Sequence, residues 1–405
     1  MEPIKPQGSI KRAGFRTLFS GLLPLFVLAH FGHHLLTALP VPLLPMIRDA
    51  FALDYTQSGL LVSAFTLSYG IGQLPAGWLA DRIGRRILVT IGIIGVALAG
   101  FLVGLSPSYL MLVGFLILMG LLGGGYHPAS TPLISALVEP ERRGSALGLH
   151  AIGGSASYFL APLIAAGLAA TWGWRSPFLA LAVPTLLFGI FFYIILGRRV
   201  KPERPEPKAV TSQDKKPDVL INWRRLIPFL TLSTFAAAIT FSVISFVPLF
   251  VVDHFGVAKE QAAVFIAIFY SAGLWASLAG GYLSDRLGRL PVFITASFIT
   301  GLVIYLLNLA PSVLGIGIVL IVFGALLYIR MPVAESYLVG QTPECNRSTI
   351  LGFYYFGNLG GTGIITPIMG YLIDQFGFYT TFTTAGVALV TVTLVCTMFL
   401  WRSRD

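Results

Sequence analysis

Charged residues are scarce in this chain: Asp, Glu, Lys and Arg make up 11% of the 405 residues, and apolar residues make up 56%. A soluble domain of this length needs far more charge on its surface, so a large soluble all-α protein is excluded. The mean hydropathy is +0.82, and the apolar residues form blocks of about 20, the length that crosses a membrane. Because backbone groups inside a membrane must all be paired, these blocks are predicted to be helices.

Cysteine is almost absent, and the two present, Cys345 and Cys396, fall near opposite ends of the last two predicted helices, which excludes a disulfide framework. The chain has no H-E-x-x-H, G-x-S-x-G or paired-aspartate motif, and no G-x-x-x-x-G-K-[ST] loop. We therefore expect neither an enzyme nor an ATP-driven pump, and no catalytic residue, cofactor or metal site. The net charge of +10 does not indicate nucleic-acid binding, because the basic residues lie in loops between apolar blocks.

The apolar blocks predict an all-α membrane protein with twelve transmembrane helices. The predicted spans are residues 18–43, 56–80, 86–106, 109–136, 143–169, 175–197, 226–252, 259–283, 290–309, 312–341, 347–374 and 378–401. The predicted divisions are a cytoplasmic tail 1–17, a six-helix bundle 18–197, a linker 198–225, a second six-helix bundle 226–401 and a tail 402–405. The linker is rich in Pro, Lys, Arg and Glu, a composition that cannot build a core.

Basic residues gather on one side of the predicted bundle. The other side holds little beyond Arg48, Arg175 and Lys259. By the positive-inside rule, both termini and the linker are therefore expected in the cytoplasm. We expect a multi-pass protein of the plasma membrane, the inner membrane of a bacterium, that functions as a monomer.

A charged hairpin occurs twice, 204 residues apart, as G-W-L-A-D-R-I-G-R-R from Gly77 and G-Y-L-S-D-R-L-G-R-L from Gly281. Further matches at this offset are Pro128 with Pro332, Arg143 with Arg347, Gly148 with Gly352, and Gly153 with Gly357. Several matches at one offset indicate a duplication. Two pseudo-symmetric halves that move against each other are typical of carriers.

The first hairpin, between the second and third spans, resembles the signature loop of the major facilitator superfamily. The resemblance covers essentially the whole chain and implies the major facilitator fold, with this loop closing the cytoplasmic side of the outward-open state. A simple positive-inside anchor would explain the arginines but not the repeated glycine. The implied gate residues are Gly77, Asp81, Arg82, Gly84, Arg85, Arg143, Gly281, Asp285, Arg286 and Arg347. Leu290 replaces the last basic residue of the second copy, which predicts a weaker gate there.

The first span carries three histidines, His30, His33 and His34, spaced so that they share one helical face. Ionisable residues at membrane depth are costly and indicate function. Imidazole titrates near neutral pH, so the cluster is predicted to carry protons. Polar contacts that only hold helices together remain the alternative for all three. His150, nearer the cytoplasmic end of its span, is expected in a structural role or in the gate.

The fourth span contains Gly123-Gly124-Gly125-Tyr126-His127-Pro128, which predicts a kinked helix with Tyr126 and His127 facing a cavity or a partner helix. This stretch, with the small-residue fifth span, resembles the fosmidomycin-resistance branch of the superfamily. The fifth span also resembles the antiporter motif of the superfamily, but Ser157 and Ala161 stand where that motif has glycines. Helix packing alone would also select small residues at these positions.

Arg330 lies about eleven residues from the cytoplasmic end of the tenth span, too deep to reach water comfortably. At the 204-residue offset it corresponds to Tyr126. A buried arginine needs an anionic partner, which is either a substrate or a carboxylate. Glu335 is the nearest carboxylate in sequence, but on a straight helix it lies roughly 140° around the axis, so pairing would need a kink at Pro332.

The eleventh span begins Gly352-Phe353-Tyr354-Tyr355-Phe356-Gly357-Asn358. Tyr354 and Asn358 share a face and Tyr355 lies beside them. The family resemblance implies that this helix lines the central cavity, so these groups are expected to hydrogen-bond a solute. Further candidates are Gln73, Tyr158 and Tyr270.

The predicted function is secondary active transport of a small organic solute with an acidic group, by alternating access and coupled to protons. The expected partners are the solute, protons and the lipid bilayer, with no nucleic acid. The substrate-binding candidates are Arg330, Tyr126, His127, Tyr354, Tyr355, Asn358 and His30, and the proton-coupling candidates are His30, His33, His34, His127 and Glu335. An exporter that exchanges drugs or antibiotics for protons is the alternative, and a channel or a membrane-embedded enzyme is a further one.

Overall fold

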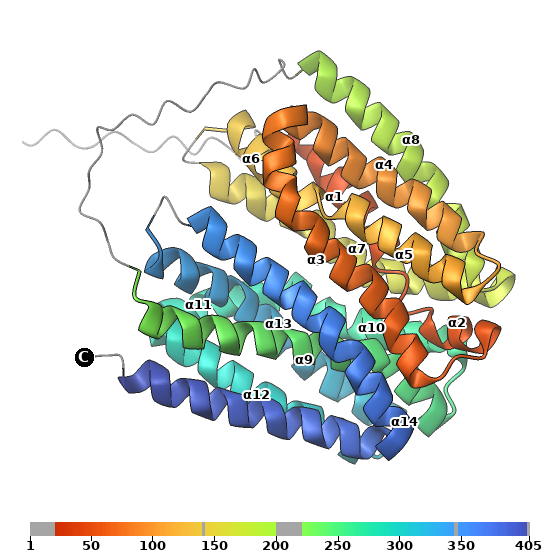
Figure 1. Ribbon diagram of the computed structural model, residues 1–405, viewed down its shortest axis with the longest axis vertical. Helices are drawn as coiled ribbons and strands as arrows, with labels where there is room; N and C mark the ends of the chain where they lie inside the picture. The colour runs from red at the N-terminus through yellow and green to blue at the C-terminus, as the bar shows by residue number, and fades with distance from the viewer. Residues whose placement is uncertain (1–20, 140–141, 200–220, 344–346, 403–405) are drawn as a thin grey trace, which may run out of the picture.

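The computed structural model describes residues 21–139, 142–199, 221–343 and 347–402 (Figure 1). The predicted tail 1–17, residues 200–220 of the linker 198–225 and residues 403–405 of the tail 402–405 lie outside this part of the chain. The side chains of Asp81 and Arg347 and the surroundings of Gly77 also lie outside it. The described residues form helices and connecting turns, with no strand among them.

The helices follow one another with short connections. In chain order they are α1 (Leu23–Thr37), α2 (Leu44–Phe51), α3 (Tyr55–Ile83), α4 (Arg85–Gly104), α5 (Tyr109–Gly123), α6 (Tyr126–Leu137), α7 (Arg143–Trp172), α8 (Arg175–Arg199), α9 (Trp223–Phe255), α10 (Lys259–Ser271), η3 (Ala272–Leu274), α11 (Ala276–Leu287), α12 (Arg289–Leu309), α13 (Val313–Gln341) and α14 (Arg347–Arg402). Gly377, with φ of 76°, interrupts α14. The interruption falls in the gap predicted between the last two spans.

Eight helical segments of the described chain are long and apolar enough to cross a membrane. A ninth arises if α10 and α11, which are bent by 44° at their junction, form one broken span. The shorter α1 is also apolar. The all-α membrane fold is therefore confirmed, whereas the number of twelve spans stays a prediction.

The duplicated hairpins have the same backbone geometry. Gly84 ends α3 with φ of 89° and ψ of 140°, and Gly288 ends α11 with φ of 89° and ψ of 146°. Side chains rarely tolerate this positive φ, so a glycine is required at both turns. The repeat found in the sequence is thus also a repeat of local structure.

Two groups of helices lie side by side in Figure 1, α1 with α3 to α8 and α9 to α14. We call residues 21–199 the N-half and residues 221–402 the C-half. Within the N-half α1 packs on α7 and α4 on α8, and within the C-half α14 packs on α9 and α12. The halves meet where α3 packs on α14 and α7 packs on α10.

The two ends of the bundle differ. We call the end where α8 ends and α9 begins the linker end, and the end that carries α2 and the start of α3 the latch end. Figure 1 shows α3 and α14 close together near the latch end and farther apart toward the linker end. A Cβ atom built on Gly148 or Gly352, in the linker-end half of α7 and α14, would meet no atom of the described residues within 4 Å.

The kink predicted in the fourth span is present as a break between α5 and α6 at Gly124 and Gly125. Gly124 allows a close approach, because a Cβ there would lie 2.7 Å from the Tyr69 carbonyl oxygen on α3. By contrast α13 is one continuous helix through Pro332. The kink that an Arg330–Glu335 pair would need is not seen as a break in that helix.

Candidate functional site

Five of the six histidines gather in one buried cluster within the N-half. His30, His33 and His34 come from α1, His127 from the first turn of α6, and His150 from α7. Their rings contact one another, with centroid separations between 4.2 Å and 6.0 Å. The spacing on α1 predicted one shared face. The sequence did not show that His150 of α7 stacks on His30, and its expected role in structure or in the gate stays a prediction.

His30 is held in one orientation by α7. Its Nδ1 lies 2.8 Å from the His150 carbonyl oxygen, and since a carbonyl only accepts, Nδ1 donates the proton. The opposite nitrogen, Nε2, is buried and has no hydrogen-bond partner in the described chain. Gly154 makes room for the ring, because a Cβ there would lie 2.6 Å from it. A neutral His30 thus directs a free lone pair into the cluster.

His33 has both ring nitrogens engaged. Nδ1 donates to the Gly92 carbonyl oxygen at 2.9 Å, and Nε2 accepts from the Tyr69 hydroxyl at 3.0 Å. The ring stacks on Tyr126 with centroids 4.5 Å apart, and Tyr126 is fully buried. The fully engaged His33 is suited to fixing α1 against its neighbours.

His34 and His127 face each other across α1 and α6, with their Nε2 atoms 3.2 Å apart. His34 Nδ1 lies 3.1 Å from the Thr37 hydroxyl oxygen. The His34 ring also lies against Tyr158, which in turn packs on Tyr270 of the C-half. The two tyrosines predicted as weaker candidates therefore connect the histidine cluster to the other half.

Arg330 is buried in the C-half, 3% exposed, on the middle of α13. Its Nη2 donates to the Thr240 hydroxyl on α9 at 2.8 Å, and its Nε has no partner in the described chain. Its side chain forms no ion pair with Glu335 among the described residues. A guanidinium is always protonated, so this charge is solvated here mainly by one hydroxyl.

The remaining candidates of the C-half form two pairs near Arg330. The Tyr354 ring is buried, interacts with the Arg330 charge and hydrogen-bonds Asn358. The Tyr355 hydroxyl hydrogen-bonds the Glu335 carboxyl group. The amide oxygen of Asn358 is buried and has no hydrogen-bond partner among the described residues. The structure thus brings the predicted groups of α13 and α14 together, and leaves polar atoms of Arg330 and Asn358 available for a ligand.

The predicted gate residues lie at the linker end. Arg82 lies over the Trp78 ring at 4.0 Å, and Arg286 over the corresponding Tyr282 ring at 4.5 Å. Arg143 donates to the Ser135 carbonyl oxygen at 3.0 Å, and Asp285 is exposed. Each of these contacts stays within one half. The gating role of this set remains a prediction.

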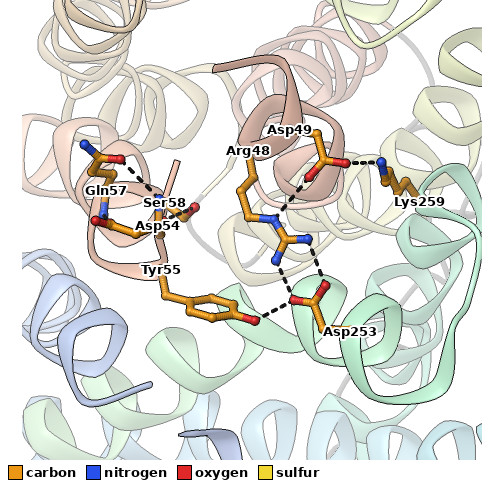
Figure 2. A network of polar contacts seen from close by, with 8 residues as sticks. All are labelled: Arg48, Asp49, Asp54, Tyr55, Gln57, Ser58, Asp253 and Lys259. Carbon is orange, nitrogen blue, oxygen red and sulfur yellow. Dashed lines mark hydrogen bonds and ion pairs between the residues drawn. The ribbon is translucent and has the colours of Figure 1, made fainter. Parts of the chain in front are cut away.

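The halves are joined by charge at the latch end (Figure 2). Arg48 of α2 forms a bidentate ion pair with Asp253 of α9, with Nη2 to Oδ1 at 2.8 Å. Asp49 pairs with Lys259 at the start of α10. The Tyr55 hydroxyl donates to Asp253 at 2.7 Å. We call these five residues the latch.

A carboxylate of the C-half also caps a helix of the N-half. Asp374 accepts hydrogen bonds from the backbone N–H groups of Tyr55 and Thr56 at 3.0 Å and 2.8 Å. These N–H groups begin α3, where unpaired donors and the helix dipole favour a negative charge. Asp54 caps the same helix from within the N-half by accepting from Gln57 N–H. Closure of the latch end therefore also completes the capping of α3.

Small residues let α3 and α14 touch along the latch-end half of both helices. A Cβ on Gly59 would lie 2.9 Å from the Thr366 carbonyl oxygen, and one on Gly363 would lie 2.7 Å from the Leu67 Cβ. Ser63 donates to the Gly363 carbonyl oxygen. Small residues that allow backbones to approach are the usual means of helix association in membranes. A comparable role falls to the fifth span, where Gly153 and Gly154 of α7 seat α1.

Sequence reasoning missed most of the latch. Arg48 and Lys259 were recognised only as rare basic residues of one side, and their partners Asp49 and Asp253 carried no motif. Short connections with isolated charges of both signs were the available signal.

The model of the Major Facilitator Superfamily matches residues 26–250 and 229–405. The chain belongs to this superfamily. A probable sulfoacetate transporter of Cupriavidus necator is 26% identical over 367 residues, 83% of each protein. A multidrug resistance protein of Escherichia coli is 28% identical over 340 residues, 82% of each protein. A bacterial homologue of the human lysosomal transporter Spinster, solved in an inward-facing and occupied conformation, superposes with a TM-score of 0.76 at 17% identity, over 96% of this chain and 97% of that one.

Membership of this superfamily confirms two predictions. The protein is a transporter and not an enzyme, and its fold is the one that the signature hairpin implies. The chain is an integral, multi-pass membrane protein. The fosmidomycin-resistance branch stays an expectation.

Proposed function

We propose that the protein is a proton-coupled secondary transporter of a small organic anion, and that it works by alternating access. The observation that carries the proposal is Arg330, a buried guanidinium with an unpaired Nε and no carboxylate partner in the described chain. A solute carboxylate or sulfonate would supply the missing negative charge, with Tyr354 and Asn358 as neutral hydrogen-bonding neighbours. The sulfoacetate transporter among the relatives is consistent with such a solute.

Proton coupling is proposed through groups of both halves. The N-half offers His30 with a free Nε2 and the His34–His127 pair. The C-half offers Glu335, which shares a hydrogen bond with Tyr355. Tyr158 lies against His34 and packs on Tyr270 of the C-half, so the histidine set reaches the interface between the halves. Protonation of Glu335 would remove the negative charge that lies on the same helix as Arg330.

The latch indicates which state of the transport cycle the structure represents. Ion pairs join the halves at one end, while α3 and α14 separate toward the other (Figure 1). We assign the latch end to the outside of the membrane, because the arginine-rich hairpins lie at the opposite end. The proposed state is therefore closed to the outside, with the linker end as the inner entrance. The plasma membrane and the cytoplasmic position of both termini are part of this proposal.

Counterflow in proteoliposomes tests the proposal. Vesicles loaded with an unlabelled organic acid should accumulate the labelled acid transiently, and an inward proton gradient should raise its initial uptake rate. Sulfoacetate and small dicarboxylic acids are the first solutes to test. Uptake that saturates without counterflow would indicate a channel, and a rate unaffected by the proton gradient would contradict coupling.

A drug–proton exchanger is the second candidate, favoured by the similarity to the multidrug resistance protein. It predicts proton release driven by cationic or neutral drugs, with no requirement for Arg330. The same vesicles, loaded with a pH indicator, separate the two candidates.

A further inference from the structure

Three histidines of the buried cluster have the arrangement of a metal-binding site. His30, His34 and His127 each present one ring nitrogen, and the three atoms lie within 4.8 Å of one another. His30 and His34 are buried, and His127 is partly buried. We propose that these three side chains bind one divalent first-row transition-metal ion, with Zn²⁺ as the best fit. The proposal goes beyond transport and does not depend on the solute. With the ion bound, the three ligand nitrogens no longer accept protons, and proton coupling would then rest on Glu335.

Two of the three ligand histidines already have a second-shell contact. A metal-bound histidine usually donates its other N–H to a backbone carbonyl or another oxygen, which fixes the ring and its tautomer. His30 Nδ1 makes this contact with the His150 carbonyl oxygen, and His34 Nδ1 makes it with the Thr37 hydroxyl. Both rings are therefore held with Nε2 directed into the cluster.

The proposed ligand atom of His30 is Nε2, and the site accounts for its lack of a hydrogen-bond partner among the described residues. This nitrogen is buried, and a buried polar atom that lacks a partner is costly. A metal ion would engage this lone pair together with those of His34 and His127. Two tyrosine rings pack on the ligand histidines: Tyr126 stacks on His30, and Tyr158 lies against His34.

The distances are compatible with a tetrahedral ion after a small adjustment. With Zn–N bonds of about 2.0–2.1 Å, tetrahedral geometry places two ligand nitrogens about 3.4 Å apart. The Nε2 atoms of His34 and His127 are 3.2 Å apart. Rotation of the partly buried His127 ring is the available adjustment toward His30. Three imidazoles leave a fourth position for water or for an anionic group of a solute.

The ligand chemistry selects the class of ion. Imidazole suits Zn²⁺, Co²⁺, Ni²⁺ and Cu²⁺, whereas Mg²⁺ and Ca²⁺ require oxygen ligands. No carboxylate is among the three ligands. Sequence alone predicts no metal site here, because two ligands lie on α1 and the third on α6, 93 residues beyond His34.

Cobalt titration of the full chain tests the site. The protein is purified with an affinity tag that contains no histidine, and Co²⁺ is added while the visible bands of four-coordinate cobalt are recorded. We expect one Co²⁺ per chain, displaced by Zn²⁺ and unaffected by excess Mg²⁺. The substitutions His30→Gln, His34→Gln and His127→Gln should each weaken binding by about tenfold or more.

His254→Gln is the matched control, because His254 is the sixth histidine and lies in the last turn of α9, stacked on Phe250 at the latch end. This variant should bind cobalt like the unmodified protein. Equal loss in His254→Gln, or unchanged binding in all three cluster variants, would overturn the proposal. X-ray absorption of the zinc-loaded unmodified protein gives a test without substitutions. Three nitrogen ligands at about 2.0–2.1 Å are expected, and a shell without imidazole would overturn the site.

Discussion

Arg330 introduces a guanidinium into the middle of α13, and its described surroundings compensate the charge only in part. Thr240 provides one hydrogen bond, and Tyr354 lies nearby. Eleven residues separate Arg330 from Gln341, the last residue of α13, or about 16 Å at 1.5 Å per residue. An anion bound at Nε would complete the hydrogen bonding of the side chain. Its role can therefore be tested by its effect on solute affinity.

Replacing Arg330 by Gln should raise the KM for an acidic solute by about tenfold or more, which corresponds to ~1.4 kcal/mol or more of lost binding. The charge is removed while a polar side chain is retained. Initial uptake rates in proteoliposomes give the measurement. Arg198→Gln, which removes an exposed charge at the end of α8, is the control. An unchanged KM in the Arg330 variant would contradict the anion site.

Glu335 provides a separate test of coupling. Glu335→Gln should abolish the stimulation of uptake by a proton gradient while solute counterflow continues, because exchange of solute needs no net proton movement. The control is Glu139→Gln, whose carboxylate is 73% exposed at the linker end. If uptake by the Glu335 variant still follows the proton gradient, coupling through this carboxylate is wrong.

At the scale of single residues, the sequence shows which polar residues lie within apolar blocks, but not which side chains they contact. Arg330, Tyr354 and the histidines of α1 could be named because ionisable and polar residues are rare within apolar blocks. The contact with Thr240 could not, since it joins α13 to a helix 90 residues earlier. The contact of His150 with His30 could not be predicted for a related reason, because it depends on how α7 packs against α1.

At the scale of helices, the contact between α3 and α14 is the part of the interface that must change if the halves rock. Its closeness rests on glycines that meet backbone or Cβ atoms of the other half. The paired hairpin glycines were predictable from the repeat. The register of α3 against α14 was not, because small residues are common in every helix of this chain, with 44 glycines in all.

The substitution Gly363→Leu should open the latch end. The added side chain would collide with Leu67, whose Cβ lies 2.7 Å from the position of a Cβ on Gly363. Labelling of a Ser63→Cys reporter by a membrane-impermeant maleimide should speed up several-fold, in a background without the two native cysteines. Gly167→Leu is the control, because a Cβ on Gly167 would meet none of the described atoms within 4 Å. Equal labelling rates in the two variants would contradict a role of this contact in closure.

At the scale of the whole molecule the latch fixes which end is closed. The side chains of Arg48 and Asp253 are 15% and 26% exposed, so water screens their attraction only in part. Burial alone would raise the pKa of the Asp49 carboxyl group. The hydrogen bond and charge of Lys259, with the charge of Arg48, instead hold this pKa below its ordinary value.

Charge reversal tests the latch. Arg48→Asp and Asp253→Arg should each favour opening of the latch end, and the double variant should restore closure at least in part, because the pair is re-formed with reversed sign. The distance between spin labels on Trp172→Cys and Phe376→Cys, two exposed positions of the two halves, reports opening. A double variant that is as open as the sum of the single variants would show that the pair does not act as a unit.

The contribution of the Asp49–Lys259 pair to closure of the latch end should not change with pH between about 5 and 8. A lowered carboxyl pKa stabilises the closed state above the ordinary Asp value of about 3.9, and this contribution is lost only as the pH falls through the lowered pKa. The same spin-label distance should therefore stay constant over this range in the absence of solute. It should lengthen at high salt, because partly exposed ion pairs are screened. A distance that changes between pH 8 and pH 5 would assign pH sensing to this end.

The order of charges in the latch has a consequence for how the halves recognise each other. Each half presents one cation and one anion: Arg48 and Asp49 on one side, Asp253 and Lys259 on the other. A docking that exchanged the partners would oppose Arg48 to Lys259 and Asp49 to Asp253, and such like-charge contacts are repulsive. The charge pattern therefore favours a single alignment of the N-half on the C-half. Two half-molecules produced as separate chains should still find this alignment without the linker to guide them.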